Sequence, residues 1–97
     1  MPVFAFAVLA LAHFFDWASF MVMIGRHGLA AEANPIVVQV FQETGIPGVT
    51  IAKVATVAFA AILALLILPN RRRLGMGLIT FGVAAGLFGG LTNVLTL

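Results

Sequence analysis

The sequence predicts an all-α integral membrane protein with three transmembrane helices and one short amphipathic helix, in a single membrane domain covering residues 1–97. Hydrophobic residues make up 63% of the chain and charged residues only 8%, whereas soluble domains carry roughly 25% charge. A soluble bundle of this composition would expose large apolar patches and aggregate. Three apolar stretches, at residues 3–24, 49–68 and 74–97, are each long enough to cross a bilayer.

The first span, residues 3–24, is apolar apart from His13, Asp16 and Ser19. At about 1.5 Å per residue it extends roughly 33 Å, which is enough to cross the hydrocarbon core. It has no basic start and is long for the apolar part of a signal peptide, so we interpret it as a membrane helix. Gly25 is predicted to end it, because glycine commonly follows the last residue of a helix.

A short amphipathic helix is predicted at residues 35–44, between the first two spans. Asn34 and Pro35 suit its N-cap and its first helical position. Apolar residues and one threonine share one face, opposite a polar face: Ile36, Val37, Val40, Phe41 and Thr44 against Gln39, Gln42 and Glu43. This pattern is typical of a helix at the membrane interface. Gly45 is predicted to end it.

The second and third spans, residues 49–68 and 74–97, flank a basic triplet at Arg71, Arg72 and Arg73. Basic loops stay in the cytoplasm, so the triplet predicts a cytoplasmic N-terminus and an external C-terminus in a multi-pass inner-membrane protein. Because the triplet acts in topology, we predict no nucleic-acid partner. The predicted partner of the chain as a whole is the lipid bilayer.

Three polar side chains lie at matching depth in the predicted spans. Asp16 is about 12 Å below the outer boundary, and Lys53 and Asn93 lie close to the outer ends of their spans. An unpaired carboxylate at that depth costs at least about 2.5 kcal/mol. We therefore expect Asp16 to pair with Lys53 and to accept a hydrogen bond from Asn93. His13 and Ser19 lie one helical turn on either side of Asp16.

This polar cluster has two interpretations: an ion pair that fixes the register of the helices, and a site that handles protons or ions. A haem or chlorophyll ligand is a further interpretation of His13, but Leu9 stands where light-harvesting helices have a small residue. No cofactor is therefore predicted. The chain has no cysteine, and its His, Asp and Glu residues lack metal-ligand spacing. No metal site and no enzymatic reaction are predicted.

Small residues recur every four positions on two spans. Gly82, Gly86 and Gly90 do so on the third span, and Ala52, Thr56, Ala60 and Ala64 do so on the second. Helices in lipid associate by close backbone approach, so both stripes predict packing faces. The spacing leaves open whether the partner helix belongs to the same chain.

The residues from His13 to Lys53 resemble a family of small prokaryotic membrane proteins of unknown function. Members of that family have an Asp in one span, a Glu-x-Asn-Pro loop and a Lys in the next span. The matching positions here are Asp16, Glu32, Asn34, Pro35 and Lys53. The resemblance implies a prokaryotic membrane and a linked role for these five residues, but no activity. Water channels also carry Asn-Pro, but twice and followed by alanine, so no pore is assigned.

The leading functional hypothesis is a small accessory or structural subunit that packs into a larger membrane complex, because three helices enclose little space and the small-residue stripes require partners. The alternative is an oligomeric ion or proton transporter or channel that uses Asp16 and Lys53. The first hypothesis predicts other membrane subunits as partners, and the second predicts further copies of the same chain.

Overall fold

The computed structural model describes residues 3–32 and 34–97. Along these residues the chain is almost entirely helical, with the elements α1 (Val3–His27), η1 (Leu29–Ala31, a 3-10 turn), α2 (Pro35–Ile67) and α3 (Arg72–Thr96). By length and composition, each α-helix could cross a membrane. The predicted all-helical class with three candidate transmembrane helices is therefore confirmed.

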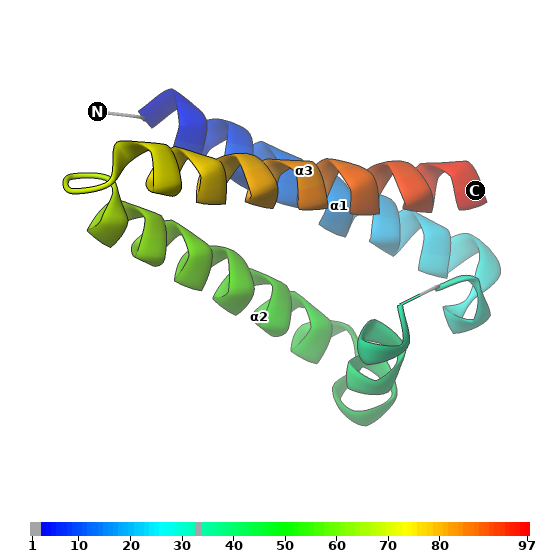
Figure 1. Ribbon diagram of the computed structural model, residues 1–97. Coiled ribbons are helices and arrows are strands. Elements are labelled where there is room, and N and C mark those ends of the chain that lie inside the picture. Colours follow the sequence, from blue (N-terminus) through cyan, green and yellow to red (C-terminus); the bar gives the residue numbers. More distant parts are fainter. Residues whose placement is uncertain (1–2, 33) are drawn as a thin grey trace.

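Two of the helices form a closely packed pair, and the third diverges from it. α1 and α3 lie side by side along most of their length, whereas α2 lies close to them only near the turn that joins it to α3 (Figure 1). Leu9, Ala64 and Ile79 form a buried apolar cluster where the three helices meet. We call this end of the molecule the turn end.

The opposite end, which we call the loop end, brings together the C-terminal ends of α1 and α3. His27 Nε2 lies 2.9 Å from the carbonyl oxygen of Leu97 and donates to it. The predicted stop at Gly25 is wrong, because α1 continues to His27. Gly28 has the left-handed φ of 75°, and its N–H donates to the Ile24 carbonyl. The later glycine therefore fills the role predicted for the earlier one.

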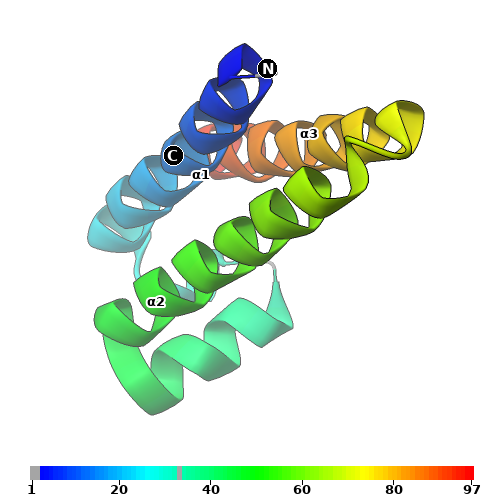
Figure 2. The ribbon, with the colours of Figure 1, turned by 90° about the vertical axis from the view of Figure 1, so that its left-hand side faces the viewer.

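α2 includes the residues predicted as a separate amphipathic helix. Its helical conformation is interrupted at Gly45, which has φ 73° and ψ −165°, and the part before Gly45 turns back from the rest (Figure 2). A side chain at Gly48 would collide with Thr44, so this sharp turn requires a second glycine. The interruption thus falls at the glycine that was predicted to end the amphipathic helix, and a separate helix at the membrane interface is not shown.

The glycine stripe of α3 lies directly against α1. Gly82, Gly86 and Gly90 contact Leu9, Ala12 and Phe15, respectively. A Cβ at Gly86 would stand 2.9 Å from the backbone carbonyl carbon of Ala12, closer than an ordinary contact. These glycines therefore set the spacing of the α1–α3 pair. The alanine stripe of α2 is used differently, because Ala64 is buried while Ala52 and Thr56 are exposed.

Candidate functional site

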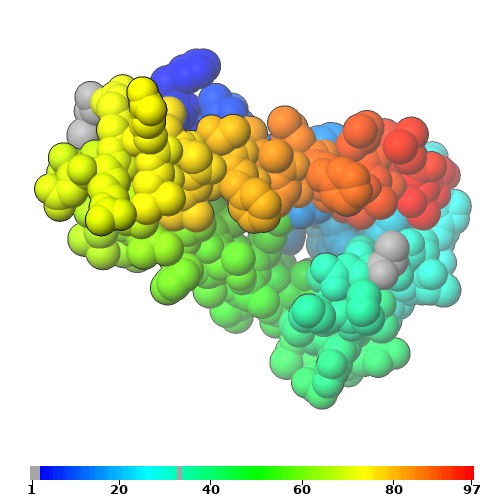
Figure 3. Space-filling view, viewed as in Figure 1, coloured from blue at the N-terminus to red at the C-terminus, as the bar shows by residue number. Residues whose placement is uncertain are grey.

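A cavity of about 630 Å³ lies where α2 diverges from the α1–α3 pair. The space-filling view shows α2 in contact with the pair at the turn end and separated from it towards residues 35–44 (Figure 3). All three helices and the loop before α2 contribute to the lining, which is mostly apolar. The polar residues predicted at matching depth lie on its wall, so the cavity is the candidate site.

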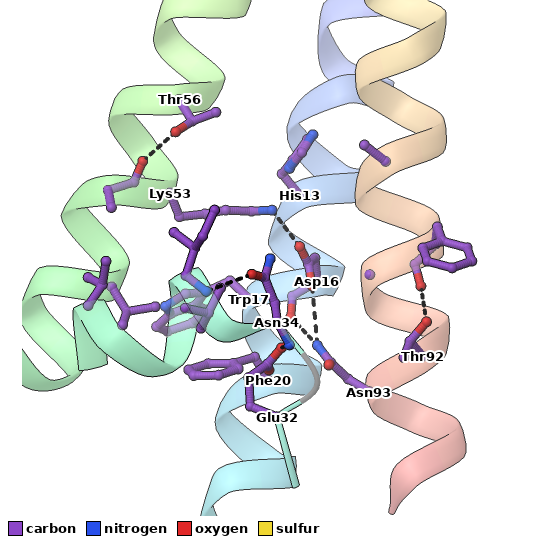
Figure 4. A pocket seen from close by; sticks show the side chains of 18 residues that line it. His13, Asp16, Trp17, Phe20, Glu32, Asn34, Lys53, Thr56, Thr92 and Asn93 are labelled. Carbon is purple, nitrogen blue, oxygen red and sulfur yellow. Dashed lines mark hydrogen bonds and ion pairs between the residues drawn. The ribbon is translucent and has the colours of Figure 1, made fainter. Parts of the chain in front are cut away.

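The expected pair of Asp16 and Lys53 is present in this wall. Lys53 Nζ on α2 donates to Asp16 Oδ2 on α1 at 2.5 Å (Figure 4). The two side chains are 24% and 22% exposed, because they border the open cavity and are not enclosed in a core. The pair therefore links the diverging helix to the packed pair at a position that a ligand could reach.

The carboxylate of Asp16 is held on its other side by α3. Asn93 Nδ2 lies 3.2 Å from each of three acceptors, namely Asp16 Oδ1, the Asp16 carbonyl oxygen and Ser19 Oγ. Ser19 Oγ in turn donates to the Asp16 carbonyl at 3.0 Å. A Cβ at Gly89 would come within 2.7 Å of Asp16 Oδ1, so this glycine makes room for the carboxylate. Nothing in the spacing of the glycine stripe pointed to Gly89.

His13 lies in the same wall but contacts a different group. Its Nε2 is 2.8 Å from the carbonyl oxygen of Gly82. A carbonyl can only accept, so Nε2 carries the proton and Nδ1 is left as an acceptor. Among the described residues, this Nδ1 is a buried nitrogen without a hydrogen-bond partner. His13 is thus close to the ion pair without a direct hydrogen bond to it.

A second polar link between α1 and α2 was not predicted. Trp17 Nε1 donates to Thr50 Oγ1 at 2.9 Å. Trp17 directly follows Asp16 on α1, and Thr50 lies about one turn before Lys53 on α2. A signal for it exists in the sequence, since an indole N–H in an apolar helix needs an acceptor, and Thr50 lies three residues before Lys53. Two adjacent polar contacts therefore connect α1 to α2.

The loop motif forms a local capping structure. Glu32 Oε1 accepts from the backbone N–H of Asn34 at 3.0 Å. Asn34 Oδ1 accepts from the N–H of Ile36 at 3.0 Å, and Pro35 occupies the first turn, so the predicted N-cap is confirmed. Glu32 and Asn34 also line the cavity. In the described part of the chain, Lys53 forms its ion pair with Asp16 and not with Glu32.

The arrangement provides hydrogen-bond donors and a compensated ion pair beside an apolar space. Within residues 3–32 and 34–97, no three His, Asp or Glu side chains come together to hold a metal ion. Comparisons with protein-family models, curated proteins and solved structures find no match to this chain. Because a fold alone does not define a function, the residues of the site are the basis for the function of this chain.

Proposed function

We propose that the chain is a small accessory subunit of a larger membrane complex and that α2 is its main contact with neighbouring subunits. The observation that carries this proposal is the poor burial of α2. Among the described residues of this helix, Ala64 alone is buried, although the helix has a small-residue stripe suited to close packing. The chain's own helices therefore leave most of α2 free for a partner.

A subunit role also fits the apolar packing that closes the space between the three helices at the turn end. At the turn end, the space between them is filled by Leu9, Ala64 and Ile79, all of them apolar. In the part of the chain that the structure describes, further apolar side chains, among them Phe6, Val57 and Val83, pack against this cluster, and the polar groups of the cavity lie on one side of it. Because this apolar cluster closes the space between the helices, a single chain offers an ion no polar route along its axis. A structural subunit does not require such a route.

The membrane orientation is part of the same proposal. With the arginine triplet in the cytoplasm, the loop end and the cavity lie in the outer half of a prokaryotic inner membrane, and residues 35–44 lie near its outer interface. The resemblance to the small prokaryotic family supports a linked role for its motif residues. Four of them line the cavity: Asp16, Glu32, Asn34 and Lys53.

The second candidate is an oligomeric proton or ion transporter. The observation in its favour is that His13, Asp16 and Lys53 line one cavity, and ionisable residues within membrane helices commonly mark ion pathways. In an oligomer, neighbouring chains would have to supply the route past the apolar cluster. In this candidate function, the ion pair of Asp16 and Lys53 takes part in transport, whereas in the subunit proposal it holds the helices together.

Photo-crosslinking in native membranes tests the subunit proposal. A crosslinking amino acid is placed at Phe59 or Ile62 on the exposed face of α2, and at Leu11 or Phe14 on the exposed face of α1 as controls. We expect discrete adducts with a different membrane protein from the α2 positions and mainly lipid adducts from the controls. Homodimer adducts from α2, with ion flux in liposomes, would instead establish the transporter. Lipid adducts from all four positions would refute both.

A further inference from the structure

The shape of the cavity limits what can occupy it. Its volume of about 630 Å³ falls within the range of about 300–1,000 Å³ typical of small-molecule pockets. The cluster around Leu9, Ala64 and Ile79 closes it at the turn end, and Ile36, Val37 and Val40 of α2 line it at the loop end. A transmembrane helix needs a slot that is open along its whole length. The occupant must therefore be short.

The polar groups on the wall determine which head group fits. Both carboxylate oxygens of Asp16 already accept hydrogen bonds, from Lys53 and from Asn93. The ammonium group of Lys53 has three N–H donors, and one of them is directed to Asp16. Lys53 itself lines the cavity, so its ammonium group can be reached from that space. Lys53 can therefore donate to a ligand oxygen. Among the described residues, the acceptor that lacks a partner on the same wall, His13 Nδ1, is buried and is out of reach of a ligand in the cavity.

The charges on the wall exclude ionised ligands. Asp16 and Glu32 outnumber Lys53 among the charged lining residues, so an anion would meet net negative charge. A cation would be placed beside the ammonium of Lys53, and like charges in a medium of low dielectric repel strongly. An uncharged group that only accepts hydrogen bonds avoids both the repulsion from the carboxylates and the repulsion from the ammonium group.

From these three features we propose that the cavity binds an uncharged lipophile whose head is a carbonyl group, as in an ester or a quinone. The carbonyl oxygen accepts from Lys53, and the apolar body lies between α2 and the α1–α3 pair. The proposal goes beyond the subunit role and does not depend on it, because the site is complete within one chain.

Trp17 provides the assay, since it lines the cavity and is the single tryptophan of the chain. The full chain is reconstituted in phosphatidylcholine bilayers, and quenching of its fluorescence is followed with three brominated probes of equal length. These are the methyl ester of dibromostearic acid, the ionised acid at alkaline pH, and dibromooctadecane. We expect saturable quenching at low mole fraction by the ester, and only linear, partition-type quenching by the other two probes.

Two alanines of α2 give a matched pair of variants. Both are exposed, but Ala52 lines the cavity and Ala55 does not. Ala52→Phe should weaken the saturable binding of the ester by about tenfold or more, whereas Ala55→Phe should leave it unchanged. Lys53→Met should remove the preference for the ester over the alkane, which a merely smaller cavity would not do.

A further arm identifies the source of the carbonyl. Saturation by the single-chain ester assigns a freely diffusing lipophile. Saturation only by a dibrominated diacylglycerol, which is also uncharged, assigns the ester groups of a two-chain lipid, and both results support the proposal. It is overturned if the acid or the alkane binds as well as the ester, if Ala52→Phe and Ala55→Phe behave alike, or if a co-purified partner helix shields Trp17 from every probe.

Discussion

Replacing Gly86 by alanine tests the packing that holds α1 against α3. The added Cβ would stand 2.9 Å from the Ala12 carbonyl carbon and 3.0 Å from its oxygen, whereas ordinary contacts lie at 3.4–4 Å. The neighbouring atoms belong to a helix backbone, so the two helices must separate by roughly half an ångström. Overpacking of this kind costs about 1–3 kcal/mol. We expect Gly86→Ala to lower the free energy of unfolding by about 1–2 kcal/mol, because alanine's better helix propensity offsets part of the cost.

Gly77 is the matched control on the same helix, since a Cβ there meets nothing within 4 Å. Gly77→Ala should leave stability unchanged or raise it by up to about 1 kcal/mol, and the larger Gly86→Leu should disrupt the fold or lower its yield. Stability is measured by titrating the protein from mild detergent into sodium dodecyl sulfate while following Trp17 fluorescence. If Gly86→Ala is as stable as Gly77→Ala, the α1–α3 contact described here is wrong.

Three further predictions use the same preparation or simple fusions. Asn34→Ala removes the bond to the Ile36 N–H and should cost about 1 kcal/mol, whereas Asn34→Asp should be tolerated; equal losses would argue against the cap. Gly45→Ala forces a side chain into a φ of 73° and a ψ of −165°, a region that essentially only glycine adopts, and should cost about 1–3 kcal/mol. Gly25→Ala, in a helix and facing open space, should not be destabilising, and the reverse order would exclude the turn at Gly45. A reporter fused after Leu97 should be external, and a cytoplasmic signal would reverse the proposed orientation.

The three long helices, and the meeting of their polar residues at one level, could be predicted because both expectations follow from the thickness of a bilayer. Helices that cross the same slab in alternating directions bring residues of equal depth to the same level. Asp16, Lys53 and Asn93 meet for this reason. The ends of the helices were harder to predict, because Gly25 and Gly28 both suit a helix end, and the choice depends on which backbone N–H reaches the Ile24 carbonyl.

The divergence of α2 could not be predicted. In water, an apolar helix face is stabilised by packing against another apolar surface of the protein. In lipid, acyl chains solvate such a face as well as another helix does, so the hydrophobic pattern does not show which helix faces contact each other. The alanine stripe of α2 and the glycine stripe of α3 therefore both predicted a packing face. Only the glycine stripe of α3 is packed along its length. The hydrogen-bond partner of His13 could not be predicted from the sequence either. It is the backbone carbonyl of Gly82, and a residue of any type provides such a carbonyl.

The ion pair between Asp16 and Lys53 links the diverging helix α2 to α1, and a double-mutant cycle tests this link most directly. Removing either partner leaves the other charge uncompensated. Because the side chains are 22–24% exposed, the coupling should exceed the roughly 0.6 kcal/mol average for polar contacts between membrane helices and stay below the about 3–5 kcal/mol lost when a fully buried pair is broken.

Asp16→Asn, Lys53→Met and the double variant are therefore compared with the wild type in the detergent titration. We expect each single change to be destabilising and the double change to recover about 1–2 kcal/mol of the summed losses. Additive losses, agreeing within about 0.5 kcal/mol, would show that the two side chains do not interact and that α2 is not held to α1 at this site.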